Sequence, residues 1–266
     1  MVQRVRLRYT KRGRLRFTSH RDFQRAFERA LRRAEVPMAY SAGFTPHPRI
    51  SYTGAAPTGT ASEAEYLEIA LTERRDPQRL RELLDASLPQ GLDVVDAVEA
   101  RTPGFAERLQ ASEWELRLPQ VPVEEAARAA AAFLAQRSVE VQRQTKKGMR
   151  TFDARAAVVS LEPAATADAA PSAAGSDGPG EPPCAILRLV VRHVTPAVRP
   201  DDVLSGLRAT ADLAPPVPVA VTRLAQGPLD EEAGTVTDPF APDRDADTAA
   251  TTAAGLTVAT APEGTA

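Results

Sequence analysis

The chain switches between a two-residue and a helical period of apolar positions, and this switching predicts a mixed α+β fold. Residues 2–9 alternate apolar and polar side chains, the pattern of a strand with one buried face. Over residues 20–34 the apolar positions take helical spacing, and arginines occupy the opposite side. Ser19 stands at the N-cap position of this helix, and Pro37 ends it by about Val36. We therefore expect the fold to begin with a strand followed by an amphipathic helix.

The elements after this helix complete a β-α-β-β-α-β order, with one short additional strand. Asp76 is expected to cap a helix over residues 77–87, with Pro77 at its first position. Such an order is the ferredoxin-like arrangement. Strands are expected at residues 15–17, 38–40, 65–71 and 92–98, with a turn at residues 11–13.

The second part of the chain approximates the same order. Its pattern predicts strands at residues 114–118, 139–144, 149–161, 184–193 and 217–224, and helices at residues 122–136 and 200–210. The sequence thus predicts an α+β protein with two tandem ferredoxin-like units, at residues 1–105 and 106–225. No internal sequence repeat is visible, so this duplication rests on the order of the elements.

Two segments have a composition that disfavours folding. Residues 164–183 and 226–266 consist mainly of Ala, Thr, Pro, Gly and Asp, with few large apolar side chains. Segments of this kind bury too little surface to offset chain entropy. We expect a flexible loop at residues 164–183, inside the second unit, and a disordered acidic tail at residues 226–266.

The formal net charge of −2 conceals a strong gradient along the chain. Residues 1–50 carry thirteen Arg and Lys against three Asp and Glu, a net charge of +10. The predicted loop has a net charge of −3 and the predicted tail −7, which leaves +8 for the remainder. A basic body of this kind favours a polyanionic partner.

The single cysteine, Cys184, narrows the possible chemistry. It excludes an internal disulfide framework, a four-cysteine zinc site and an iron–sulfur cluster held by this chain alone. No apolar run is long enough to span a membrane, and the N-terminus lacks the apolar core of a signal peptide. We expect a cytoplasmic protein with no membrane contact.

Arginines line one side of the predicted helix and continue into the segment before it. Guanidinium groups match phosphate oxygens, and clustered positive charge raises affinity for a polyanion by counterion release. A solvated helix face is the alternative interpretation. The candidate RNA-binding arginines are Arg16, Arg21, Arg25, Arg29, Arg32 and Arg33.

A loop at residues 40–49 combines glycine, two prolines, a histidine and two aromatic side chains. The prolines stiffen the backbone, and the aromatic rings suit stacking on bases. A connection with no further role is the alternative. The candidate RNA-binding residues here are Tyr40, Ser41, Gly43, Phe44 and Arg49. Lys146 and Lys147, at a predicted turn, are either a hairpin tip or a second phosphate contact.

His20, Asp22 and His47 are the candidates for acid–base catalysis. His20 adjoins a helix N-terminus, which attracts anions. The alternative is that Ser19 and Asp22 cap the helix while His20 has no further role. Two histidines and a carboxylate can also hold a metal, but this spacing is not diagnostic and no metal site is assigned.

Three stretches form the most specific motifs: residues 14–22 (RLRFTSHRD), 25–34 (RAFERALRRA) and 40–48 (YSAGFTPHP). Together they resemble the uncharacterised bacterial radical-SAM-linked protein family. Weaker similarities extend this resemblance over about residues 2–225, at residues 63–68 (EAEYLE), 145–148 (TKKG) and 199–204 (RPDDVL). The chain differs from the common pattern at Arg21, where the family often has Leu, and at Thr45, where it often has Asn.

The resemblance implies a radical SAM partner, because relatives carry this domain fused to or encoded beside a radical SAM protein. It also suggests RNA, because relatives are encoded near ribonuclease E/G. His20, Asp22 and His47 lie in its densest motifs. This chain has no CxxxCxxC motif, so S-adenosylmethionine and a 4Fe–4S cluster are expected on a separate partner chain, with no cofactor bound here.

The leading prediction is a non-catalytic accessory protein that binds RNA, a tRNA or an rRNA, and presents it to a radical SAM enzyme. One alternative is an RNA-modifying or RNA-processing enzyme that uses His20, Asp22 and His47. Another is a protein–protein adaptor whose arginine face meets an acidic partner, such as its own tail.

Overall fold

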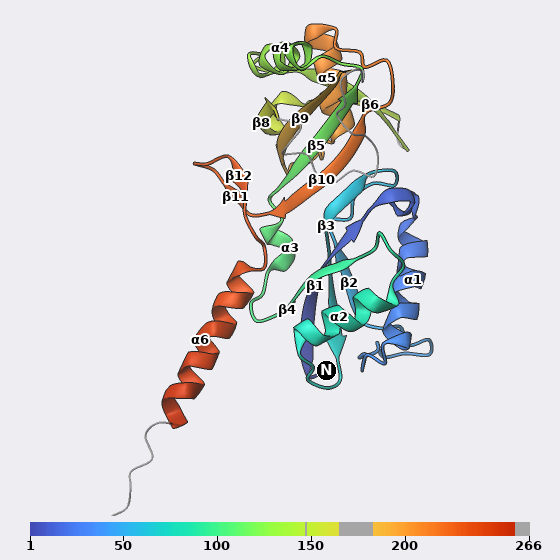
Figure 1. Ribbon diagram of the computed structural model, residues 1–266, viewed down its shortest axis with the longest axis vertical. Helices are drawn as coiled ribbons and strands as arrows, with labels where there is room; N and C mark the ends of the chain where they lie inside the picture. The colour runs from blue at the N-terminus through green and yellow to red at the C-terminus, as the bar shows by residue number, and fades with distance from the viewer. Residues whose placement is uncertain (147, 165–182, 259–266) are drawn as a thin grey trace, which may run out of the picture.

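The computed structural model describes residues 1–146, 148–164 and 183–258, and a mostly antiparallel sheet runs through its centre (Figure 1). Among these residues eight strands join this sheet, in the order β4-β1-β3-β10-β5-β9-β8 with β2 also paired to β3. The strands of the sheet are β1 (Gln3–Lys11), β2 (Ile50–Thr53), β3 (Ala61–Leu71), β4 (Val94–Glu99), β5 (Ala111–Pro119), β8 (Val158–Pro163), β9 (Cys184–Arg192) and β10 (Ala220–Gly227). The predicted loop at residues 164–183 falls on residues 165–182, which lie outside the described residues, as does Lys147.

The first half of the sheet consists of β4, β1, β3 and β2, and every neighbouring pair among them is antiparallel. Helices α1 (His20–Arg33) and α2 (Pro77–Ser87) pack on it, as their apolar periods predict. The caps are also as predicted, because Ser19 accepts from the Asp22 N–H and Asp76 accepts from the first turn of α2. Phe27, Leu67 and Leu84 are almost fully buried in this core.

The second half has strands β10, β5, β9 and β8, again antiparallel at each pairing. Helices α4 (Val123–Leu134) and α5 (Pro200–Ala211) cover it, and Phe133, Leu116 and Leu207 fill a second core. A separate hairpin of β6 (Glu140–Thr145) and β7 (Gly148–Asp153) precedes a single 3-10 turn, η2 (Arg155–Ala157). Each half therefore has its own hydrophobic core and its own pair of long helices.

The two halves join where β10 runs parallel to the first residues of β3. This short pairing is reinforced by buried polar side chains. Arg223 forms an ion pair with Glu65 and donates to Ser62 Oγ at 3.3 Å. Gln226 donates to the carbonyl oxygen of Ala64 at 3.2 Å. The join is therefore polar, in contrast to the apolar cores on either side.

The prediction of a disordered tail from residue 226 is wrong for residues 226–249. This part of the chain forms β11 (Leu229–Asp230), β12 (Thr235–Val236) and the start of α6 (Ala241–Val258). The Phe240 ring is fully buried against Tyr66 and against Phe105 of the short helix α3 (Phe105–Arg108). The average composition of the segment did not indicate that Phe240 would be buried. Beyond its first turn, α6 extends away from the rest of the molecule (Figure 1). Residues 259–266 lie outside the described residues.

Three local predictions in the first half are also wrong. Residues 15–17 belong to a 3-10 helix, η1 (Gly13–Phe17), because Gly13 adopts a φ of +53° and turns the chain. Lys11 is the last residue of β1 and not part of a turn. Residues 38–40 make only isolated bridges, and the short additional strand that pairs with β3 is β2 at Ile50–Thr53. In the described part of the chain, no helix is long and apolar enough to cross a membrane.

Candidate nucleic-acid interface

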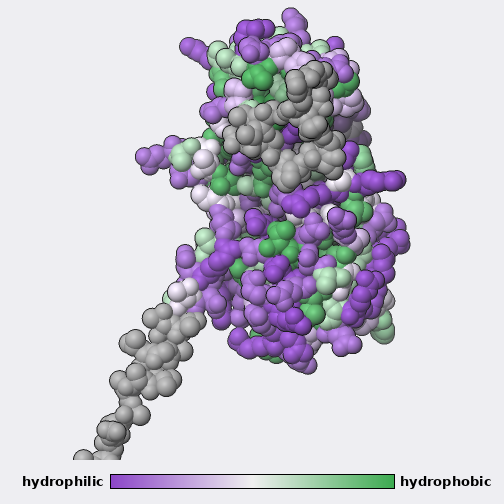
Figure 2. Space-filling view, in the orientation of Figure 1, coloured by the Kyte–Doolittle hydropathy of each residue, from purple (hydrophilic) through white to green (hydrophobic). Residues whose placement is uncertain are grey.

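Helix α1 turns its apolar side to the sheet and its arginines to solvent. Phe23 and Phe27 are at most 4 % exposed, and Phe23 stacks on Tyr9 with ring centroids 4.5 Å apart. The opposite side is fully polar, and hydrophilic side chains cover the edge of the molecule where α1 lies (Figure 2). At about 100° per residue, four exposed arginines fall within about 80° of one another. We call these the arginine stripe: Arg21, Arg25, Arg29 and Arg32.

The arginine stripe has few acidic partners within ion-pair distance. Exposed arginines elsewhere in the described residues are of both kinds: Arg79 pairs with Glu82 at 3.0 Å, whereas Arg137 has no carboxylate within 4.0 Å. In the stripe only Arg25 has a carboxylate within 4.0 Å among the described residues, and Asp22 lies at that limit. Glu28 is the one acidic side chain on the same side of the helix, so the stripe keeps a net positive charge, which attracts polyanions. Arg33 lies to one side of the stripe and donates to the Ser87 carbonyl oxygen at 3.0 Å.

The loop at residues 41–49 is closed by its own hydrogen bonds. The Ser41 N–H donates to the His47 carbonyl oxygen at 2.9 Å, and the His47 N–H donates to Ser41 Oγ at 3.0 Å. Gly43 has a φ of +126°, a value that favours glycine. Phe44 is completely exposed at the tip, and Tyr40 is 52 % exposed at the base. Both rings are open to stacking partners.

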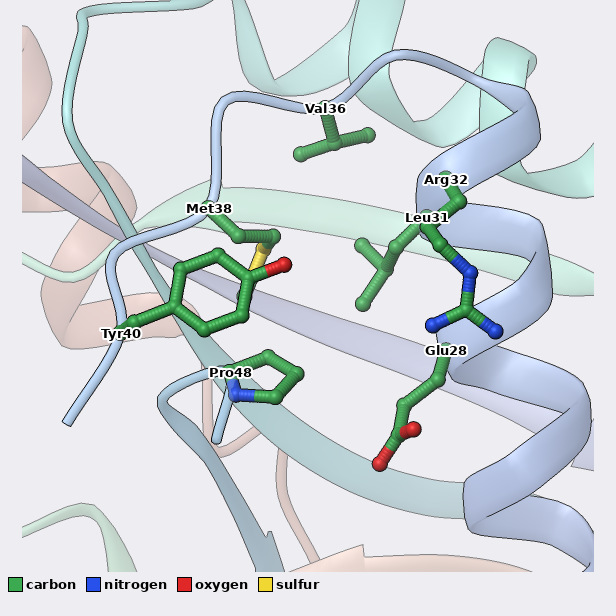
Figure 3. Close-up of a pocket in the computed structure, with 7 residues that line it drawn as sticks. All are labelled: Glu28, Leu31, Arg32, Val36, Met38, Tyr40 and Pro48. Carbon is green, nitrogen blue, oxygen red and sulfur yellow. The ribbon is translucent and has the colours of Figure 1, made fainter. Parts of the chain in front are cut away.

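The arginine stripe and this loop meet at a small hollow (Figure 3). Its volume of about 30 Å³ holds one or two water molecules, so a base would have to stack outside it. The Arg32 guanidinium and the Tyr40 ring both face this hollow. Two features that the sequence predicts separately are thus parts of one surface. The hollow is lined by Glu28, Leu31, Arg32, Val36, Met38, Tyr40 and Pro48.

The structure places His20 and Asp22 together at the first turn of α1. Asp22 accepts a hydrogen bond from Ser19 Oγ at 2.7 Å, as expected if Ser19 and Asp22 cap the helix. The His20 ring lies edge-on to Tyr52 with ring centroids 4.9 Å apart, and its Nε2 lies 3.1 Å from Gln24 Nε2. His20 is therefore held at the rim of the aromatic cluster beneath α1.

His47 lies toward the other end of α1. It precedes Pro48, which lines the hollow beside Arg32, twelve residues along the helix from His20. At about 1.5 Å per residue this is about 18 Å of helix. In the residues that the structure describes, no three His, Cys, Asp or Glu side chains are grouped as metal ligands. His20, Asp22 and His47 are thus not brought together.

Phe17 is an exposed aromatic residue that the strand prediction for residues 15–17 concealed. Its ring is 58 % exposed and carries the Arg16 guanidinium over its face, 4.5 Å from the centroid. It directly precedes the capped start of α1, at the opposite end of the arginine stripe from Tyr40. Phe17 lies within the motif at residues 14–22, two residues before the N-cap Ser19. This position was the sequence signal for an aromatic side chain at the start of α1. Cationic and aromatic groups therefore flank both ends of the stripe.

The remaining candidates lie apart from this surface or at its margin. Lys146 is exposed on the β6–β7 hairpin in the second half, and Arg49 is exposed just before β2. The acidic C-terminal segment contacts other arginines: Asp243 lies 3.0 Å from Arg108, and Asp247 lies 2.7 Å from Arg101. Among the described residues, none of its carboxylates lies within 4.0 Å of the arginine stripe. The described part of this segment therefore does not neutralise the stripe.

Comparison with known proteins supports a bacterial family but no activity. A search of curated proteins finds no match to this chain. Residues 4–200 match a family described as uncharacterized protein conserved in bacteria (DUF2344), and this match includes α1, the loop and every strand of the sheet except β10. Because it covers well over half of the sequence, the chain belongs to this family of uncharacterized bacterial proteins.

Proposed function

We propose that this protein binds RNA along the arginine stripe, with Phe17, Tyr40 and Phe44 stacking on unpaired bases. The observation that carries the proposal is a row of exposed arginines with almost no acidic partners, flanked at both ends by exposed aromatic rings. Proteins that bind single strands combine a basic track with aromatic stacking platforms in this way.

The dimensions of the surface suit a short single-stranded segment. From Arg21 to Arg32 the helix rises about 16 Å, a length over which several backbone phosphates fit. Single-stranded RNA can also turn its bases outward onto aromatic side chains, which a duplex cannot do. The preferred ligand is therefore a loop or end of a tRNA or an rRNA.

The topology supports a finer description of the fold. Within each half the strand order reads fourth, first, third, second, as β4-β1-β3-β2 and as β10-β5-β9-β8, with helices after the first and third strands. We infer that the halves are two ferredoxin-like units, since β-α-β-β-α-β is the order of that motif. A platform of two such units leaves α1 and its loop free on one edge.

In this proposal the chain is a non-catalytic partner that presents RNA to a radical SAM enzyme. The single cysteine supports a division of labour, because the S-adenosylmethionine and 4Fe–4S chemistry then belongs to the other chain. Co-purification from the native host tests this part: a radical SAM protein and RNA should be recovered together with the chain. Recovery of RNA without such a protein would leave RNA binding standing and refute the partnership.

The stacking part is tested with a fluorescent single-stranded 12-nucleotide RNA in an anisotropy titration. Loss of one base–aromatic stack costs about 1–3 kcal/mol, so Phe44→Ala should weaken binding by about 5-fold to 150-fold. The exposed Met149 of β7 provides a matched control, and Met149→Ala should leave the affinity unchanged. Equal affinities for all three proteins would contradict a stacking role for this loop.

A further inference from the structure

The carboxylate of Asp243 lies in a buried group of hydrogen-bond donors on the first half of the sheet. Its side chain is fully buried, and five donors contact its two oxygens. Two guanidinium groups donate to one oxygen, while a hydroxyl and two successive backbone N–H groups donate to the other. We call these donors the anion site: the guanidinium groups of Arg6 and Arg108, the hydroxyl of Thr102, and the N–H groups of Arg101 and Thr102.

The anion site has more donors than a carboxylate can satisfy. Arg108 donates at 3.0 Å, the Thr102 hydroxyl at 2.7 Å, and the N–H groups of Arg101 and Thr102 at 3.0 and 2.9 Å. A carboxylate offers about four lone-pair positions to these donors, whereas a phosphate group offers three strongly accepting oxygens. Successive backbone N–H groups directed at one anion are also common in phosphate sites. The donor set therefore suits a phosphate group better than the carboxylate that fills it.

The positive charge at the anion site exceeds the negative charge that the chain supplies. Among the described residues Arg108 has no other carboxylate within 4.0 Å, and Arg6 shares Glu68 with Arg4. Three guanidinium groups thus face two carboxylates, which leaves a net charge of +1. A phosphate monoester carries about −1.5 to −2 at pH 7, so it would neutralise this group more fully than Asp243 does.

An aromatic ring accompanies the carboxylate on the same segment. Phe240 contacts Tyr66 and Phe105, with ring centroids 5.4 and 5.6 Å apart. Both guanidinium groups of the anion site lie over the Phe105 ring, with Arg6 at 4.8 Å and Arg108 at 5.8 Å from its centroid. The C-terminal segment therefore presents a ring and an anion to neighbouring parts of one surface, as the base and phosphate of a nucleotide would.

The segment that fills this surface is attached apart from the two main cores. Phe240 packs in a small separate apolar cluster. Helix α6 is further attached by ion pairs between partly exposed side chains, Arg101 with Asp247 and Arg244 with Asp96, and then extends away from the molecule (Figure 1). Exposed ion pairs contribute little, and an element with few buried contacts opens locally before the domain unfolds. The anion site can thus be uncovered while both cores stay folded.

We propose that the anion site binds the phosphate of a nucleotide, and that Asp243 and Phe240 fill this nucleotide site in the free chain. The phosphate would replace the carboxylate, and the base would stack on Phe105 in place of the Phe240 ring. Nucleotide and C-terminal segment then compete, so that binding of the nucleotide releases the segment. Because Arg6 alternates with the core residues Val5 and Leu7, the site lies on the sheet face opposite α1 and uses no residue of the arginine stripe.

Chymotrypsin cleavage after Phe240 measures release of the segment, because this ring is fully buried while the segment is docked. We would follow this cleavage in the full chain by mass, in adenosine monophosphate against sodium chloride of equal ionic strength. The nucleotide should speed cleavage at least about tenfold, since the rate follows the population of the open form. General stabilisation by a phosphate compound would slow cleavage, so the sign separates the two effects. Unchanged or slower cleavage in the wild type overturns the proposal.

Two variants of the full chain test whether the anion site causes this effect. Arg108→Gln removes a donor of the site, and Arg101→Gln is the matched control because it removes the ion pair with Asp247 but keeps the Arg101 N–H. Adenosine monophosphate should speed cleavage in Arg101→Gln as in the wild type, and not in Arg108→Gln. An equal acceleration in both variants would place the nucleotide elsewhere and overturn the proposal.

Direct binding provides a second measurement that does not depend on proteolysis. In isothermal titration calorimetry Asp243→Ala should bind adenosine monophosphate at least about tenfold more tightly than the wild type, because no carboxylate competes for the site. Asp245→Ala should bind like the wild type, since Asp245 is exposed on the same helix. If Asp243 were only a structural partner of Arg6 and Arg108, Asp243→Ala would bind no more tightly, and that result contradicts a nucleotide site.

The phosphate can belong to a free nucleotide or to the end of an RNA chain, and the second source rests on the proposed function. The cleavage assay is therefore repeated with the 12-nucleotide RNA, with and without a terminal phosphate. Acceleration by adenosine monophosphate but not by RNA identifies a free nucleotide, and acceleration by the phosphorylated RNA alone identifies an RNA end. Either result supports the site. Loss of RNA affinity in variants of the arginine stripe, with these accelerations intact, concerns the proposed function alone.

Discussion

Replacement of Asp243 by alanine should detach the C-terminal segment from the sheet. Asp243 is 1 % exposed and joins α6 to β1 and to the chain around α3. One carboxylate oxygen forms ion pairs with Arg6 and with Arg108, the latter at 3.0 Å. The other accepts from Thr102 Oγ1 at 2.7 Å and from the Arg101 N–H at 3.0 Å. Among the described residues, no other carboxylate of this segment is buried.

The magnitude follows from what the substitution leaves behind. Arg6 is as buried as its partner, and removal of one member of a buried ion pair costs about 3–5 kcal/mol. Arg6 retains Glu68 at 3.1 Å and the Thr102 carbonyl oxygen at 2.7 Å, so we expect the free energy of unfolding to fall by about 3 kcal/mol. The exposed Asp245 on the same helix is the matched control, and Asp245→Ala should change the free energy of unfolding by less than about 0.5 kcal/mol.

The same carboxylate makes this stability depend on pH. Burial alone would raise the pKa of Asp243, but hydrogen bonds from Thr102, Arg6 and Arg108 outweigh burial and hold the pKa below its ordinary value. A depressed pKa in the folded state adds stability above the unfolded-state pKa, and this contribution disappears as the pH falls through the folded-state value. The free energy of unfolding should therefore fall below about pH 4 in the wild type, and Asp243→Asn should lack this part of the fall.

Urea denaturation at pH 7 measures the loss of global stability, and limited proteolysis of the same samples measures detachment of the C-terminal segment. The Asp243→Ala protein should either unfold at lower urea or be cleaved faster between β12 and α6, if the segment detaches before the rest unfolds. A midpoint and a cleavage rate equal to those of Asp245→Ala would refute the role of Asp243 as an anchor.

Two smaller predictions concern packing and capping. Gly206→Ala should destabilise the protein by about 1–3 kcal/mol in urea denaturation, because the added Cβ would lie 2.6 Å from the fully buried Phe133 ring. Alanine favours helices over glycine, so a more stable variant would contradict this packing. Ser19→Ala should cost about 1 kcal/mol by the same assay, because it removes the side chain that accepts from the Asp22 N–H, and an unchanged midpoint would show that the cap contributes nothing.

Local order in the first half was predictable wherever a short pattern determined it. The boundaries of α1 and α2 follow from their caps and periods, since Ser19, Asp76 and Pro77 act on neighbouring backbone. Residues 15–17 were predicted wrongly because three alternating side chains are too few to distinguish a strand from a 3-10 turn. The error at Phe240 has another origin, because one buried ring outweighs the average composition of a long polar segment.

In the candidate site too, one part was predictable from a local pattern and another depended on the tertiary structure. The arginine stripe is a consequence of helical periodicity and was visible in the sequence. That Arg32 and Tyr40 share a hollow depends on how the chain returns after α1, which no local pattern specifies.

RNA affinity as a function of salt is the most direct test of RNA binding by the arginine stripe. The test protein carries Arg21→Gln, Arg29→Gln and Arg32→Gln. The control removes three exposed arginines that have acidic partners elsewhere, Arg74, Arg79 and Arg192. Loss of three phosphate contacts should make the slope of log affinity against log salt shallower by about 2 in the test protein, while the control keeps the wild-type slope. Equal slopes in all three proteins would contradict RNA binding by this surface.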